Sequence, residues 1–239
     1  MLQSSTLRSP LMEPLAIEIK ISEELVVRGQ EWPVQGPPVV MVHDYGEDLD
    51  CWKGVDRLLA DRGFRVITLD LPNHGLSDDQ VQDRSTLQTL TEVIKNVSEV
   101  WGPLGLCSYG SLSSELCQMR GPDAPMTHVM VSPRAPIAAP GLPADLEHEM
   151  SQLVVAATND GDRSDEARAL FDSLGAKKLW ASIGATEHGP DLVMGHTHLV
   201  DDMAIFLRRT LVSAHLEWTA ATHEKAAADF RTTESEREQ

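Results

Sequence analysis

Three side chains of the kind that perform nucleophilic catalysis follow one another along the chain in the order serine, acid, histidine. Ser108 lies in the stretch GLCSYGS, Asp160 lies in TNDGD and His188 lies in TEHG. A serine hydroxyl is a weak nucleophile that needs a neighbouring base, and a carboxylate holds an imidazole base in the correct tautomer. We therefore predict that Ser108 attacks a substrate, that His188 takes and returns the proton, and that Asp160 orients His188.

Two of these assignments have competitors. The sharp strand-to-helix turn that exposes a nucleophile usually reads G-x-S-x-G. Leu106 stands where Ser108 needs the first glycine, and Tyr109 stands where Cys107 would need the second. We favour Ser108, because a bulky side chain obstructs the close backbone approach that glycine permits; a third interpretation is that neither residue acts. Asp162 is an alternative acid, although it lies farther from the end of the preceding predicted strand.

The elements that must position these residues alternate between strands and helices. Apolar runs and alternating patterns predict strands over 15–21, 24–29, 37–46, 64–75, 103–108, 127–133, 152–160 and 177–184. Helical spacing of apolar residues predicts helices over 51–63, 85–101, 111–119, 164–175 and 197–214. Such alternation indicates a mostly parallel sheet covered on both faces, with reactive groups at the carboxyl ends of its strands. We expect one domain over residues 1–239, with a core of about 15–214 and flexible tails at 1–14 and 222–239.

Several turns after predicted strands resemble those of the α/β-hydrolase superfamily. The segment HDYG (43–46) is similar to the superfamily's His-Gly segment, and DLPNHGLS (70–77) is similar to its D-x-x-G-H-G-x-S turn. The chain order Ser, Asp, His and the loop TEHG add to the resemblance, which covers roughly residues 37–212. It implies the α/β-hydrolase fold, a mostly parallel central sheet with helices on both faces. Because 133–151 is a short Pro- and Ala-rich segment, we expect little or no cap domain.

The resemblance also implies an activity. It suggests a serine hydrolase that cleaves a carboxylic ester or thioester through an acyl-enzyme, with an oxyanion hole formed by the backbone N–H groups of Tyr45 and Tyr109. His43 and His74 would stabilise their turns. Sequence alone does not separate such a hydrolase from an acyltransferase, since both form an acyl-enzyme.

A different class of function is a protein of this fold that has lost or weakened catalysis and acts as a binding or scaffold protein. Its support is that Asp44, Asn73 and Leu106 each occupy a position where the superfamily usually has glycine.

Composition and net charge limit the classes of binding partner that we expect for this chain. The chain has 239 residues, of which 41% are hydrophobic, and a formal net charge of −17, which argues against binding to nucleic acids or anionic membranes. The three cysteines are an odd number, and their spacings are not those of a disulfide-rich domain. They indicate no disulfide framework, which is consistent with a reducing, cytoplasmic location. No phosphate-binding glycine loop is present, so we expect no cofactor, and we interpret His196-x-His198 as a solvated helix start rather than a metal site. The expected partner is a small-molecule ester, while the oligomeric state is not predicted.

Overall fold

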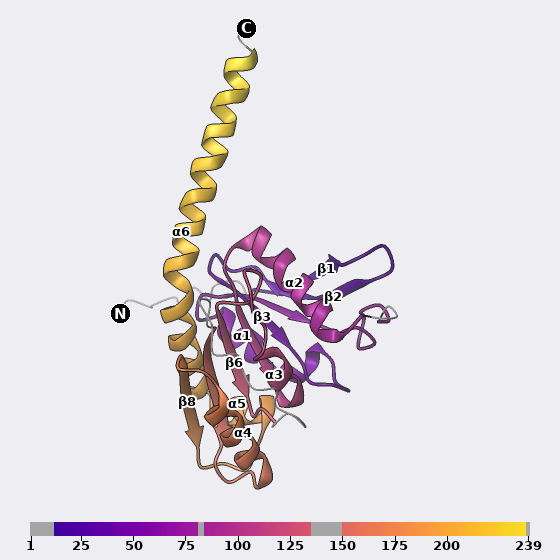
Figure 1. The fold of residues 1–239 in the computed structure, drawn as a ribbon, viewed down its shortest axis with the longest axis vertical. Coiled ribbons are helices and arrows are strands. Elements are labelled where there is room, and N and C mark those ends of the chain that lie inside the picture. The colour runs from indigo at the N-terminus through magenta and orange to yellow at the C-terminus, as the bar shows by residue number, and fades with distance from the viewer. Residues whose placement is uncertain (1–11, 81–83, 135–149, 238–239) are drawn as a thin grey trace, which may run out of the picture.

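The computed structural model describes residues 12–80, 84–134 and 150–237, and the side chains of the last helix as far as Ala227 (Figure 1). Its centre is an eight-stranded sheet of order β1-β2-β4-β3-β5-β6-β7-β8. The strands are β1 (Leu15–Lys20), β2 (Val26–Trp32), β3 (Pro38–Val42), β4 (Arg65–Leu69), β5 (Gly105–Tyr109), β6 (Thr127–Val131), β7 (Ser151–Ala157) and β8 (Lys178–Ile183). The helices are a 3-10 turn, Leu49–Trp52, and α1 (Val55–Ala60), α2 (Thr86–Trp101), α3 (Gly110–Leu116), α4 (Asp162–Ser173), α5 (Gly189–Gly195) and α6 (His198–Arg237).

The strand directions follow from the hydrophobic pattern. Every residue of β3, β5 and β6 is buried, as expected for parallel strands covered on both faces. The alternating segment β1 instead pairs antiparallel with β2, and β2 pairs antiparallel with β4. The remaining pairs are parallel. The predicted fold class is therefore confirmed, with β1 and β2 forming an antiparallel hairpin at one edge of the sheet.

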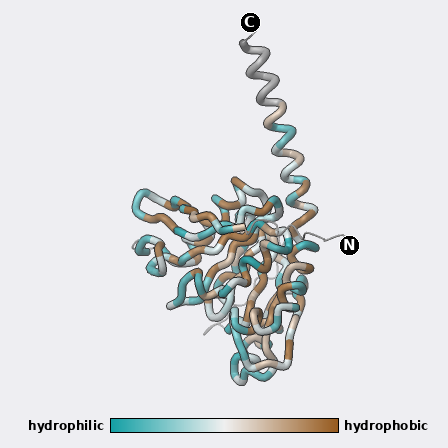
Figure 2. Tube along the Cα trace, turned by 180° about the vertical axis from the view of Figure 1, so that it is seen from behind, coloured by the Kyte–Doolittle hydropathy of each residue, from teal (hydrophilic) through white to brown (hydrophobic). Residues whose placement is uncertain are grey.

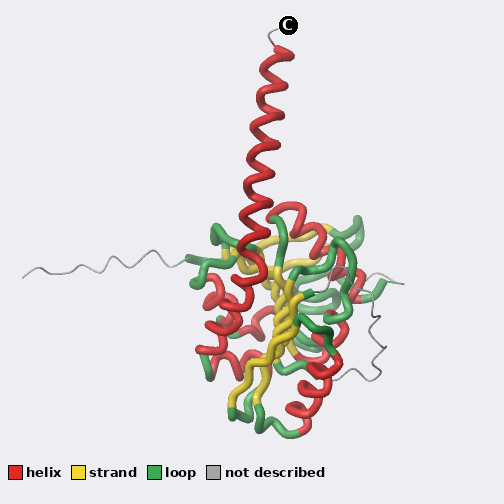
Figure 3. The backbone as a smooth tube through the Cα atoms, turned by 60° about the vertical axis from the view of Figure 1, so that its left-hand side comes forward, coloured by secondary structure: helices red, strands yellow, loops and turns green. Residues whose placement is uncertain are grey.

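Two layers of helices enclose the sheet (Figure 3). Apolar residues of α1, α5 and α6 share one core cluster with alternate residues of the central strands. Residues of α2 and α3 share a second cluster on the other side of the sheet, and α4 packs beside β7 in a third. Successive residues of one strand therefore face different helix layers, which decides where each side chain of β5 can reach.

The start of α2 follows a local sequence signal, whereas the end of α6 does not. Ser85 caps α2 through a capping box with Gln88, so this helix begins where the sequence predicts. The last helix is longer than the predicted 197–214, because α6 continues to Arg237 and projects beyond the body of the molecule (Figure 1). The predicted tail at 222–239 is thus helical over the residues that the structure describes.

The predicted small cap falls on the segment between β6 and β7. Nineteen residues, 132–150, separate these strands, and 135–149 lie outside the described residues. So short a connection leaves no room for a large cap domain.

Candidate active site

The elbow residue between β5 and α3 lies two residues after Ser108, the nucleophile that the sequence predicts. Strand β5 continues to Tyr109, and α3 begins at Gly110, whose φ angle is 68°. The strained residue of a strand-to-helix elbow is the one that carries the nucleophile in G-x-S-x-G. In this register Ser108 takes the place of the first glycine and Gly110 takes the place of the nucleophile.

The position of Ser108 corrects its predicted role. Its side chain is fully buried, and it points toward the same helix layer as Leu106, two residues earlier in β5. The hydroxyl Oγ lies 2.8 Å from Ser113 Oγ and 2.6 Å from His128 Nε2, so its hydrogen-bond partners do not include His188. A hydroxyl enclosed in this way cannot meet a substrate, because it lies beneath α3 instead of at the edge of the sheet.

His128 is a residue that the sequence gives no reason to single out. It is completely buried, and burial lowers its pKa to about 3, so its imidazole is neutral near pH 7. The distance between Ser108 Oγ and His128 Nε2 is that of a nucleophile and its base, but both side chains are buried away from any substrate. Their contact is a core hydrogen bond that ties β5 to β6.

The carboxylate of Asp44 occupies the space in front of the elbow. Its Oδ2 accepts a hydrogen bond from Ser111 N at 2.9 Å, and its Oδ1 accepts from Leu112 N at 3.1 Å and Tyr45 N at 2.9 Å. A Cβ atom on Gly110 would collide with this carboxylate. Asp44 therefore fills the volume of a nucleophile's side chain and also occupies the nearby N–H donors.

The predicted oxyanion hole changes accordingly. The N–H group that follows the elbow residue belongs to Ser111, not Tyr109, and it is bonded to Asp44. The N–H of Tyr45, the other predicted donor, also donates to Asp44. The Tyr109 side chain is buried beneath the site, where its hydroxyl donates to Glu47.

The predicted base and acid are brought together. His188 immediately precedes α5, Asp160 follows β7, and His188 Nδ1 lies 3.7 Å from Asp160 Oδ2. The His188 side chain is 50% exposed and that of Asp160 is 15% exposed. Asp162, the alternative acid, is exposed in the first turn of α4. The geometry thus favours Asp160 as the partner of His188.

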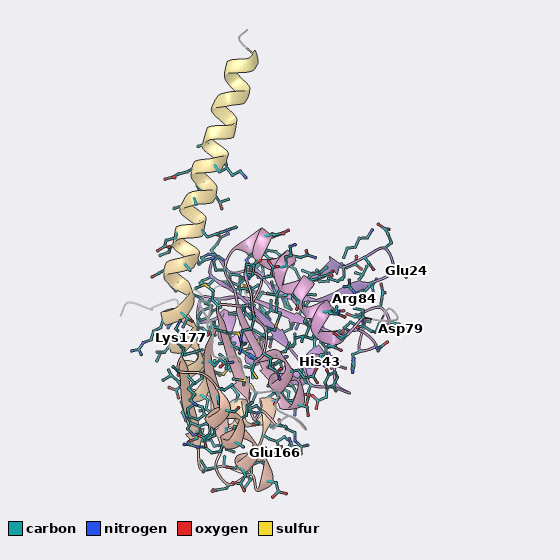
Figure 4. All side chains as sticks on the ribbon, in the orientation of Figure 1. Glu24, His43, Asp79, Arg84, Glu166 and Lys177 are labelled. Carbon is teal, nitrogen blue, oxygen red and sulfur yellow. The ribbon has the colours of Figure 1, made fainter. Side chains whose placement is uncertain are left out.

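Two histidines hold the loop that carries Asp44. His43 Nδ1 donates to Asp44 O, and its Nε2 accepts from Leu71 N at 2.9 Å; its ring lies in the middle of the body (Figure 4). Burial lowers the pKa of His43, which favours this neutral form. His74 accepts from Gly46 N at 3.0 Å through its Nε2. Both residues therefore fix turns, as the resemblance implied.

Asp70 fixes the loop that follows β4 in a similar way, by accepting backbone hydrogen bonds. Its carboxylate accepts from Leu49 N and Leu76 N, each at 2.8 Å, and it is almost fully buried. The DLPNHGLS turn is thus fastened to the loop that follows β3, which places Asp44 against the elbow.

The alternative nucleophile, Cys107, lies inside the core. Cys107 is fully buried in the core, and burial raises the pKa of its thiol far above the ordinary range, so it has little thiolate character. Within the residues that the structure describes, no group of three or more potential ligands could hold a metal ion. No described helix is long and apolar enough to cross a membrane.

Comparisons with known proteins agree with this architecture. The family described as "Alpha/beta hydrolase family" matches residues 39–234, whereas a search of the curated proteins gives no match. Similar solved structures include the esterase Pf2001 of Pyrococcus furiosus, which is 13% identical with a TM-score of 0.64 over 83% of this chain and 93% of that one. The alpha/beta hydrolase GrgF from Penicillium sp. sh18 is 12% identical, with a TM-score of 0.67 over 83% and 99%. The thioesterase domain from the curacin biosynthetic pathway is 13% identical, with a TM-score of 0.58 over 81% and 99%.

Proposed function

This chain belongs to the alpha/beta hydrolase family, and we propose that within it the chain acts as a small-molecule-binding protein that forms no acyl-enzyme. A single observation carries the negative half of the proposal, the lack of an acyl-enzyme. The elbow residue is Gly110, and the carboxylate of Asp44 fills the space that a nucleophile's side chain would need.

The chemistry of acyl transfer supports this assignment. The reaction requires a nucleophile beside the base and free N–H donors where negative charge develops on the carbonyl oxygen. Here the donors of Ser111 and Tyr45 already bind a carboxylate. A second negative charge at the same place would be repelled, because opposing charge is what stabilises an oxyanion. The formal net charge of −17 likewise favours an uncharged or cationic small molecule over nucleic acid.

A second candidate is hydrolysis of an ester or thioester without a serine nucleophile. The contact between His188 and Asp160 favours it, because an oriented imidazole can activate water as a general base. Family membership and the esterase and thioesterase neighbours make hydrolysis the first activity to assay. The Ser108, Asp160 and His188 mechanism would in addition require Ser108 to leave His128 and turn out of the sheet.

One experiment separates these mechanisms. Folded protein is treated with a fluorophosphonate, its intact mass is measured, and any modified residue is sequenced; hydrolysis of short esters and thioesters is measured in parallel. We expect neither adduct nor turnover. An adduct on Ser108 would overturn the proposal. Turnover without an adduct, lost in His188→Ala, would establish the water-activating mechanism instead.

A binding measurement tests the positive half of the proposal. A ligand at the site would contact His188, which is half-exposed, and the exposed side chain of Tyr45. Short esters are titrated while the imidazole resonances are followed by NMR, with the His188 signal identified by its absence in His188→Ala. We expect that signal to shift without product formation. A panel of small neutral and cationic molecules that leaves it unmoved would refute binding at this site.

A further inference from the structure

The last helix, α6, carries apolar residues on the face that it turns away from the body. Val200, Met203 and Leu207 on its inner face are completely buried in the core. On the opposite side, Ile205 is 49% exposed and Leu216 is 62% exposed. Large aliphatic side chains that line one face of an ordered helix can form a contact surface when they make a continuous patch.

These outward residues form one stripe. At 3.6 residues per turn, Ile205, Val212 and Leu216 fall within about 40° of one another around the helix. Ala220 and Ala227 continue the same side of α6 and are exposed. We call this set of five residues the outer stripe. Figure 2 shows apolar and polar residues mixed along the part of α6 that leaves the body.

The projecting part of α6 lacks packing within its own chain. Each described residue from Ala220 to Ala227 is exposed, and the helix stands clear of the body in the views of Figures 1 and 3. Isolated helices are marginally stable in water, and most helical stability in proteins comes from packing an apolar face. A partner helix along the outer stripe would supply that packing.

We propose that a second copy of this chain binds along the outer stripe, with the two α6 helices antiparallel and crossing at Leu216. The spacing is self-complementary about this residue. Val212 lies four residues before Leu216 and Ala220 four after; Ile205 lies eleven before and Ala227 eleven after. Val212 and Ile205 of one copy therefore meet Ala220 and Ala227 of the other, and the two Leu216 side chains meet at the crossing; the alanines let the helices approach closely on either side of it.

Charge complementarity selects this partner and this orientation. Arg209 lies seven residues before Leu216 and about 20° from it around the helix, within the span of the outer stripe, whereas Glu224 lies eight residues after Leu216 and about 80° around, beside the stripe on the same side; both are exposed. Antiparallel pairing sets Arg209 of each copy near Glu224 of the other, whereas parallel pairing would oppose like charges. Antiparallel helices also hold the two acidic bodies at opposite ends of the pair, which weakens their mutual repulsion through screening.

The first test is the oligomeric state of the full chain, measured by sedimentation equilibrium across the micromolar range. We expect a dimer in the wild type and a monomer in Leu216→Glu. The matched control is Leu179→Glu, because Leu179 on β8 is 51% exposed and lies outside the outer stripe; it should remain dimeric. A wild type that is monomeric throughout, or a dimer that Leu216→Glu leaves intact, would overturn the proposal.

The second test fixes the orientation. Arg209→Glu should raise the dimer dissociation constant about tenfold, since two exposed ion pairs are lost by symmetry. The double variant Arg209→Glu, Glu224→Arg should restore the wild-type dissociation constant. Failure of that rescue would exclude the antiparallel arrangement. Circular dichroism confirms that each variant is folded, and neither test depends on what the site binds.

Discussion

The collision between residue 110 and Asp44 makes a quantitative prediction. In Gly110→Ala the new Cβ atom meets the Asp44 carboxylate, at a φ angle of 68° that side chains rarely adopt. The backbone strain costs about 1–3 kcal/mol. Displacing Asp44 also removes its bonds to Ser111 N and Leu112 N, which we put at about 2–3 kcal/mol in all for a partly buried carboxylate. Asp44→Ala alone should lose only the second contribution.

These contributions are expected to be strongly coupled. Once Asp44→Ala has removed the carboxylate, Gly110→Ala should cost only the strain. The double variant should therefore be about as stable as Gly110→Ala alone, with a coupling free energy of about 2–3 kcal/mol. Urea unfolding of the four proteins, followed by circular dichroism, measures it. If the two costs simply add, Asp44 does not occupy the space at the elbow, and the reasoning is refuted.

Substitutions at residues 44 and 110 also test whether His188 can activate a serine placed at the elbow. Asp44→Ala combined with Gly110→Ser places a hydroxyl at the elbow and frees the N–H of Ser111, while His188 and Asp160 are unchanged. We expect a fluorophosphonate adduct at residue 110 in this variant. The matched control, Asp44→Ala with Gly110→Ala, has the same backbone but no hydroxyl and should give none. A folded variant without an adduct would show that His188 is not placed to activate the elbow.

Three further predictions concern buried groups. Ser108→Ala should destabilise the protein by about 1–3 kcal/mol, because it leaves His128 Nε2 unpaired in the core; Ser111→Ala, which alters an exposed side chain, should have little effect in the same urea titration. His128 has a pKa of about 3 when folded against 6.5 ordinarily, so the unfolded chain takes up the proton first. Its contribution to stability is complete above about pH 6.5 and falls toward pH 3 by up to about 1.4 kcal/mol per pH unit. His128→Gln should flatten that decline in urea titrations at several pH values; an unchanged slope would contradict the assignment. Cys107 should resist iodoacetamide in the native state, because it is fully buried and the reagent cannot reach it, whereas the partly exposed Cys51 should react first, although the pKa of its thiol is raised as well. Peptide mapping identifies the alkylated residue, and early labelling of Cys107 would contradict its burial.

The sequence was sufficient for most of the architecture, because its signals are local. Continuous apolar runs such as PVVMV of β3 are typical of strands buried on both faces, and the alternating LAIEIK of β1 is typical of an antiparallel edge. The capping box of Ser85 and Gln88 marks the start of α2 directly. The length of α6 was not predicted, because its projecting part is polar and alanine-rich and has no strong apolar period.

The candidate site was only partly accessible from the sequence. Asp160 and His188 follow their strands closely enough to be placed by order alone. Ser108 was misassigned because the apolar run ends there, whereas the strand continues to Tyr109. One signal could have corrected this: reading G-x-S-x-G with Gly110 in the central position puts the small residue Ser108 two places earlier and starts α3 at the elbow.

The sequence by itself determined the order of strands and helices, the family-like turns and the edge of the sheet where reactive groups gather. Those properties depend on hydrophobic period and turn chemistry, which are encoded within a few neighbouring residues. Only the tertiary structure decided that Ser108 faces His128 beneath α3, and that Asp44 reaches N–H groups 67 and 68 residues away. Such contacts depend on the strand register and on which helix layer covers each face. The nature of the site therefore follows from packing between distant segments.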